Sequence, residues 1–116
     1  MKRIFIILLT LNLSLAMSAF AGPKKETKEI AIQTSAICKM CKDRLESNLI
    51  YEKDVKKVTL DMKTKILTIK YRADKTNPET LKKAVSDLGY DADEVPADAK
   101  AYDELPACCK KDAAPH

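Results

Sequence analysis

The sequence predicts an α+β fold, a ferredoxin-like βαββαβ sandwich with two helices on one face of a four-stranded antiparallel sheet. Apolar residues alternate along short segments, as they do in half-buried strands, and recur at helical spacing in two longer segments. Turn and capping residues separate these segments in the order strand, helix, strand, strand, helix, strand. The domain is expected at residues 29–95, followed by a C-terminal tail at residues 96–116.

The first half of the domain is expected to form a strand, a helix and a second strand. The first strand lies at residues 29–35, with Ile30 and Ile32 on its buried face. The helix covers residues 39–52. Its buried stripe consists of residues four apart, namely Cys41, Leu45 and Leu49. A strand with alternating apolar side chains follows at residues 55–62.

The second half is expected to add a hairpin strand, a capped helix and an edge strand. The hairpin strand lies at residues 66–71. Asn77 can cap the next helix, Pro78 suits its first turn, and Gly89 suits the left-handed position that ends it. Residues 90–95 are expected to form a weak last strand, because their aspartates are typical of a solvent-exposed edge.

The N-terminus has the pattern of an export signal. Residues 1–21 combine a cationic start, an apolar run interrupted by polar residues, and a small-x-small ending that suits signal peptidase. The apolar run is short for a membrane anchor. We therefore expect cleavage near Ala21, a flexible lead-in at residues 22–28, and a periplasmic or secreted protein that meets the membrane only through its cleaved signal.

The formal net charge of +4 is small, and acidic and basic residues are interspersed along the chain. Nucleic-acid binding usually requires a concentrated basic face, which this sequence lacks. We expect a monomer with an ordinary charged surface and no nucleic-acid partner.

The four cysteines form two local pairs, Cys38/Cys41 and Cys108/Cys109. A disulfide within either pair would close only a short loop, so it would stabilise the fold little. The apolar periodicity between the pairs is sufficient for a small core without such bridges. The cysteines are therefore better explained by chemistry than by cross-linking.

Cys38 and Cys41 stand where the first strand turns into the first helix. Residues three apart share a helix face, so both sulfurs can converge on one point. The helix N-terminus carries partial positive charge, and Lys39 and Lys42 add to it. Both effects favour thiolates, which bind metals and attack disulfides. The pair is thus a candidate site for metal binding or for redox chemistry.

Residues 28–95 resemble the heavy-metal-associated domain family, which includes small copper chaperones, the periplasmic mercury-binding protein and N-terminal modules of metal-exporting P-type ATPases. The resemblance is carried by the Cys38-x-x-Cys41 loop, the apolar positions of the helices and strands, and Leu88-Gly89-Tyr90 at the end of the second helix. It departs from the family before the first cysteine, where Ser35-Ala36 stands in place of Gly-Met. The resemblance implies metal binding without catalysis, and it implies that the Tyr90 side chain approaches the metal loop.

Two soft thiolates suit ions that accept two or three ligands, chiefly Cu(I) and Hg(II). Zn(II) is less suited, because it prefers four ligands in a closed site. Copper is the first expectation, since it is the commoner cargo in the family, and mercury is the second. The resemblance implies transfer by ligand exchange with a metal-transporting membrane protein or another thiolate carrier.

Two other functions use the same residues. A thiol–disulfide oxidoreductase also begins a helix with Cys-x-x-Cys, but it would normally need a longer βαβ frame and a proline opposite the sulfurs. Pro78 is explained by helix capping, and Pro96 stands at the domain boundary. A ferredoxin-like interaction module with incidental cysteines is the third interpretation.

The Cys108/Cys109 pair lies outside the resemblance. A strand at residues 90–95 would carry the chain about 17–20 Å away from the metal loop. The segment from Val95 to Cys108 would span about 20 Å even if it were helical throughout, so the tail can return. We expect Cys108 and Cys109 either to add ligands to the metal site or to form an independent exposed pair.

Overall fold

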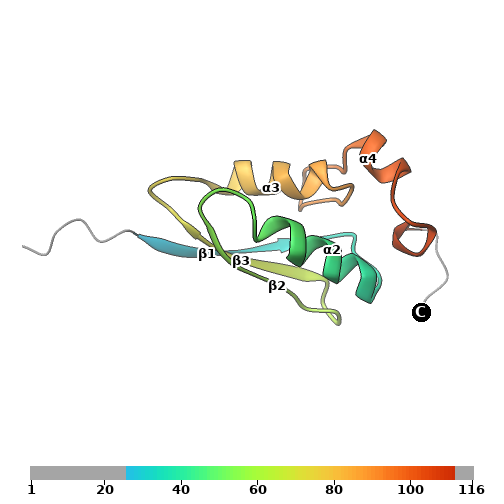
Figure 1. Ribbon diagram of the computed structural model, residues 1–116, viewed down its shortest axis with the longest axis horizontal. Coiled ribbons are helices and arrows are strands. Elements are labelled where there is room, and N and C mark those ends of the chain that lie inside the picture. The colour runs from blue at the N-terminus through green and yellow to red at the C-terminus, as the bar shows by residue number, and fades with distance from the viewer. Residues whose placement is uncertain (1–25, 112–116) are drawn as a thin grey trace, which may run out of the picture.

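The computed structural model describes residues 26–111, and its centre is a three-stranded antiparallel sheet (Figure 1). The strands are β1 (Thr27–Gln33), β2 (Val55–Leu60) and β3 (Ile66–Arg72), with the order β1-β3-β2 across the sheet. The predicted signal at residues 1–21 lies outside the described residues, as does the start of the predicted lead-in. β1 begins slightly earlier than predicted, because its first residues already pair with the end of β3.

One face of the sheet is apolar, as the alternation predicts. Leu67 of β3 pairs with Ile32 of β1 on one side and with Leu60 of β2 on the other, and all three side chains are buried. The opposite face carries the exposed side chains of Lys57 and Lys70. Because each buried aliphatic side chain contributes about 1.5–3 kcal/mol, the sequence strongly favours one orientation of the sheet.

Two helices, α2 (Lys39–Leu49) and α3 (Pro78–Asp87), lie over the apolar face (Figure 1). α2 buries the predicted stripe, which consists of Cys41, Leu45 and Leu49. α3 begins at the predicted cap, where the backbone N–H of Thr80 donates to Asn77 Oδ1 at 2.9 Å. None of the helices in residues 26–111 is long and apolar enough to cross a membrane.

The predicted fourth strand at residues 90–95 is corrected by the structure, which has isolated bridges from Ala92 to Thr34 and to Val95 in its place. Asp93 adopts a left-handed backbone with φ of 51°. Its N–H donates to the Gln33 carbonyl at 2.9 Å, and its Oδ1 accepts from the Gln33 N–H at 2.8 Å. A carboxylate thus takes the place of a strand carbonyl beside β1, so the described sheet has three strands rather than four.

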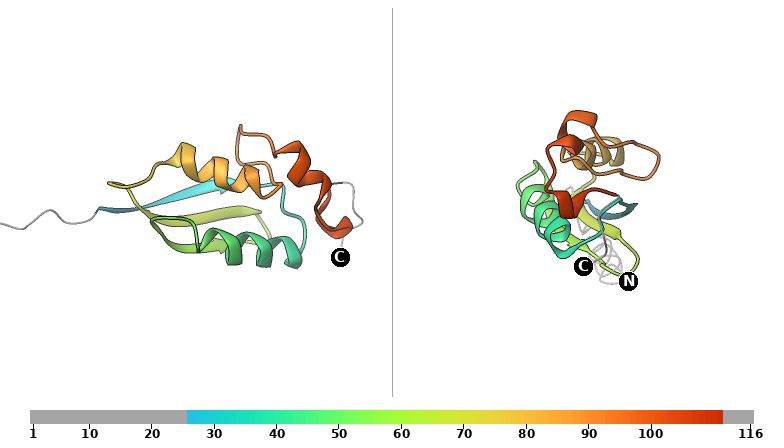
Figure 2. Two further views of the ribbon diagram at one scale, coloured as in Figure 1. Left: turned by 45° about the horizontal axis from the view of Figure 1, so that its top comes forward. Right: turned by 90° about the vertical axis from the view of Figure 1, so that its right-hand side faces the viewer.

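The tail folds back over the end of α3 and forms α4 (Ala99–Asp103) and the 3₁₀ turn η1 (Ala107–Cys109). Gly89, with φ of 100°, permits this close approach, because a Cβ there would lie 2.9 Å from the Ala101 carbonyl oxygen. Leu105 is buried beside it. The views in Figure 2 place η1 next to the N-terminal end of α2.

Candidate metal centre

The loop between β1 and α2 presents the first two sulfurs. Cys38 is the extended N-cap residue of α2, and Cys41 lies in the first turn of that helix. Their Sγ atoms are 3.0 Å apart. The strand–helix junction therefore brings both predicted sulfurs to one point.

The tail brings the second cysteine pair to the same place. Cys109 Sγ lies 3.7 Å from Cys38 Sγ and 4.0 Å from Cys108 Sγ. Cys108 also donates to the thioether sulfur of Met40 at 3.5 Å. The Sγ atoms of Cys38, Cys108 and Cys109 all lie within 4.8 Å of one another. We call the four cysteines the thiol cluster; the ligand roles of its members stay predictions.

The thiol cluster is graded from a buried interior to an exposed rim. Cys41 is 0% exposed, Cys109 1% and Cys38 6%, whereas Cys108 is half-buried. A shallow cavity of about 210 Å³ borders the rim and is lined by Cys38, Lys39, Met40 and Cys108. The Met40 thioether is linked to the cluster by its contact with the Cys108 thiol. An incoming ion or thiolate can reach the sulfurs from this side.

The thiols do not ionise equally. Burial opposes ionisation of Cys41, but hydrogen bonds from the Cys109 and Cys38 thiols outweigh it and lower the pKa of Cys41. Burial and the contact with Cys41 raise the pKa of both Cys38 and Cys109. Among the three buried thiols, Cys41 is therefore the one whose surroundings favour the thiolate.

Tyr90 lies under the thiol cluster with its side chain fully buried. Its hydroxyl has no hydrogen-bond partner of good geometry within residues 26–111. Burial, followed by the neighbouring thiols of Cys109 and Cys41, raises the pKa of Tyr90. The hydroxyl therefore keeps its proton beside the Cys109 and Cys41 thiols, and its role at the metal loop stays a prediction.

Side-chain hydrogen bonds hold the loop ahead of Cys38. Ser35 Oγ accepts from the Asp91 backbone N–H at 2.9 Å. Thr34 Oγ1 donates to the Lys65 carbonyl at 2.8 Å and accepts from the Ala36 N–H at 3.3 Å. These bonds fix a loop that lacks the Gly-Met of the family, and the sequence patterns did not identify them.

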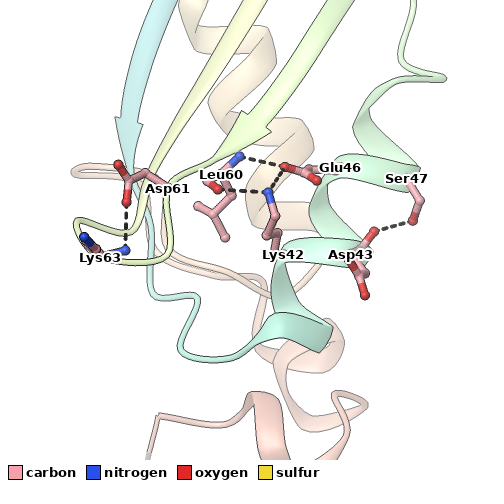
Figure 3. Close-up of polar contacts among 7 residues, drawn as sticks. All are labelled: Lys42, Asp43, Glu46, Ser47, Leu60, Asp61 and Lys63. Carbon is pink, nitrogen blue, oxygen red and sulfur yellow. Dashed lines mark hydrogen bonds and ion pairs between the residues drawn. The ribbon is translucent and has the colours of Figure 1, made fainter. Parts of the chain in front are cut away.

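The two lysines at the start of α2, Lys39 and Lys42, have different surroundings. Lys42 Nζ donates to Glu46 Oε2 at 2.6 Å and to the Leu60 carbonyl at 3.1 Å, so its ammonium bridges α2 and β2 (Figure 3). Glu46 completes the bridge by accepting from the Leu60 N–H at 2.9 Å. Lys39 lies on the rim cavity. Of the two predicted lysines, Lys39 is the one that the structure places beside the open side of the cluster.

Comparison with protein families assigns the central part of the chain to one family. Residues 35–91 match the family described as the heavy-metal-associated domain. This segment belongs to the heavy-metal-associated domain family. It contains Cys38, Cys41 and Tyr90, whereas Cys108 and Cys109 lie beyond its end.

Solved structures share the fold. The CopZ metallochaperone matches with a TM-score of 0.53 and 23% identity, over 56% of this chain and 98% of its own. Oxidized MerP from Ralstonia metallidurans CH34 matches with a TM-score of 0.55 and 22% identity. The match covers 58% of this chain and 94% of the MerP chain. A copper CopA variant from Bacillus subtilis matches with a TM-score of 0.53 and 27% identity. The match covers 60% of this chain and 92% of the CopA chain. Comparison with curated protein sequences returns no significant match.

Proposed function

We propose that the protein is an exported carrier or scavenger of a soft metal ion. It holds the ion through the thiolates of Cys38 and Cys41 and passes it on by ligand exchange, without catalysing a reaction. The observation that supports this best is the 3.0 Å separation of these two sulfurs at the start of α2, within a heavy-metal-associated domain.

The chemistry of the donors favours Cu(I), with Hg(II) second. The nearest donors are thiols and the Met40 thioether, and soft sulfur ligands select soft ions. Zn(II) is less suited, because it requires four convergent ligands. Only three sulfurs among the described residues, those of Cys38, Cys108 and Cys109, all lie within 4.8 Å of one another. With Cys41 outside this group, the four cysteines do not form the closed four-ligand set that Zn(II) prefers.

The exposed rim supports transfer to a partner. Cys38 borders a shallow cavity, so a thiolate from a partner can approach the ion before Cys41 releases it. Similar structures are described as a metallochaperone and as a copper-binding domain of a P-type ATPase. By analogy, the partner of this protein is a metal-transporting membrane protein or another thiolate carrier.

The export pattern at residues 1–21 adds a chemical requirement. In the periplasm or outside the cell, the close thiols of Cys38 and Cys41 can oxidise to a disulfide, which no longer binds metal as thiolates do. The carrier therefore needs a reductant or prompt loading with metal. Sequencing of the N-terminus of the exported protein tests this point, and we expect it to begin after Ala21.

Substitution of the two sulfurs tests the proposed function. We expect the reduced protein to compete with a Cu(I) chelator for one ion per chain, and either Cys38→Ser or Cys41→Ser to remove this competition. The matched control is Ser47→Ala, an exposed position on α2 away from the sulfurs. Unchanged Cu(I) affinity in both cysteine variants would contradict the proposal. Fast turnover of a disulfide substrate with weak metal binding would instead favour the oxidoreductase.

A further inference from the structure

We infer that the docked tail completes the metal site, with Cys109 supplying a third thiolate beside Cys38 and Cys41. The inference rests on the proposed function and extends it, because the matched domain ends at residue 91. The tail is then part of the binding machinery rather than an appendage. The ligand class is a soft ion held by three sulfurs.

The sulfur positions fit this coordination. Metal–sulfur bonds of about 2.3 Å around one ion place three sulfurs about 4 Å apart. Cys109 Sγ is already 3.7 Å from Cys38 Sγ, and the Cys38–Cys41 separation of 3.0 Å has only to widen. Cys109 is also as buried as Cys41. Both separations that Cys38 makes are therefore close to those of a three-sulfur site, and binding requires Cys41 and Cys109 to converge on the same ion.

Contacts away from the sulfurs hold the tail in position. Lys111 Nζ lies 2.6 Å from Asp91 Oδ2, and the Lys111 N–H donates to the Tyr102 hydroxyl at 3.0 Å. Leu105 is buried against Gly89. Folding therefore orders the tail before any ion arrives, so Cys109 is presented as a preorganised ligand.

The Tyr90 hydroxyl is a second observation, which indicates a missing hydrogen-bond acceptor at this point. It is fully buried, and residues 26–111 offer it no hydrogen-bond partner of good geometry. Buried donors are normally paired. A metal-bound thiolate at Cys109 or Cys41 is an acceptor that would pair it.

Cys108 lies outside this set of three. It is half-buried at the rim, and its thiol is directed to the Met40 thioether. Cys108 could replace Cys41 in a different set of three, because it lies within 4.8 Å of Cys38 and Cys109. Cys41 is the better candidate, because it is fully buried and lies nearer to Cys38.

X-ray absorption spectroscopy of the Cu(I)-loaded protein counts the sulfurs directly. We expect three sulfurs in the unchanged protein, two in Cys109→Ser, and three in the matched control Cys108→Ser. Loss of a group that only hydrogen-bonds to a metal ligand lowers metal affinity about 10- to 100-fold. Loss of the Cys109 ligand itself is therefore expected to lower Cu(I) affinity about 100-fold or more. Tyr90→Phe is expected to weaken binding without changing the sulfur count.

The outcomes separate the inference from the proposed function. Two sulfurs in the unchanged protein, or a loss in Cys108→Ser but not in Cys109→Ser, would overturn the third-ligand role of Cys109. Cu(I) binding of unchanged affinity in the Cys38→Ser/Cys41→Ser protein would overturn the proposed function itself. Thermal unfolding of each metal-free variant shows that it is folded. If Cys109→Ser unfolds, the apolar Cys109→Ala takes its place with the same expected count.

Discussion

At the scale of single residues, the metal loop is held by a few polar side chains at the edge of the core. The bridge made by Glu46 is the best defined, since it joins Lys42 of α2 to both backbone groups of Leu60 in β2 (Figure 3). Burial opposes ionisation of Glu46, but the Lys42 ammonium and the Leu60 N–H outweigh it and lower the pKa of Glu46. The bridge fixes the start of α2, and therefore the sulfurs, against the sheet.

This bridge makes stability depend on pH. An unfolded glutamate has a pKa of about 4.3, so Glu46 stabilises the fold above that pH, and the contribution is lost as pH falls through the lower folded pKa. We expect Glu46→Gln to lower the free energy of unfolding by about 1 kcal/mol at neutral pH. The loss should shrink below about pH 4.

Urea unfolding of the metal-free protein at neutral pH and at about pH 3 measures this difference. The control is Asp87→Asn, which breaks the exposed pair with Lys83 and should have almost no effect at either pH. An equal cost of Glu46→Gln at both pH values would show that the carboxylate charge contributes nothing.

At the scale of elements, the arrangement of the tail depends on one close backbone contact. Gly89 follows the C-cap residue of α3 and has a left-handed backbone, and its lack of a side chain lets α4 approach. The N–H of Asp98 adds a bond to the Ser86 carbonyl at 3.0 Å, and Ser86 Oγ donates to the Pro96 carbonyl at 2.7 Å. The end of α3 therefore serves as the platform from which η1 reaches the cluster.

We expect Gly89→Ala to destabilise the fold by about 1–3 kcal/mol and to release α4, because a Cβ there would meet the Ala101 carbonyl oxygen at 2.9 Å. Limited proteolysis within α4 detects the release. The loss in Gly89→Ala could come from the contact of the Cβ or from strain of the left-handed backbone. Gly89→Asn separates these two causes, since asparagine tolerates a left-handed backbone but carries the same Cβ. Full recovery of the protease resistance of α4 in Gly89→Asn would contradict the steric explanation.

The sequence predicted the regular elements well, because their signals are local. The alternation that buries Ile32, Leu60 and Leu67, and the cap at Asn77, depend on near neighbours in the chain. The prediction of a fourth strand was wrong, because Asp93 pairs with Gln33 through its side chain. This contact joins residues far apart in the sequence.

The site was predicted less completely than the fold. The spacing of Cys38 and Cys41 indicated their convergence, and the length of the tail showed only that Cys109 could return to them. Its return depends on how closely Gly89 and Ala101 approach, and spacing does not encode that contact. The position of Met40 beside Cys108 likewise follows from the docked tail.

At the scale of the whole molecule, the sulfurs gather at one end of the sandwich. There the loop after β1, the start of α2 and the turn η1 meet (Figure 2). The exposed face of the sheet, opposite the apolar face, carries Lys57, Thr59 and Lys70.

Native mass spectrometry of the reduced protein, offered Cu(I), Hg(II) and Zn(II) in competition, tests the central claim of a soft-metal carrier most directly. We expect one soft ion per chain, Cu(I) or Hg(II) in preference to Zn(II), and no bound ion in the Cys38→Ser/Cys41→Ser protein. A preference for Zn(II), or equal occupancy with and without these two sulfurs, would contradict the claim.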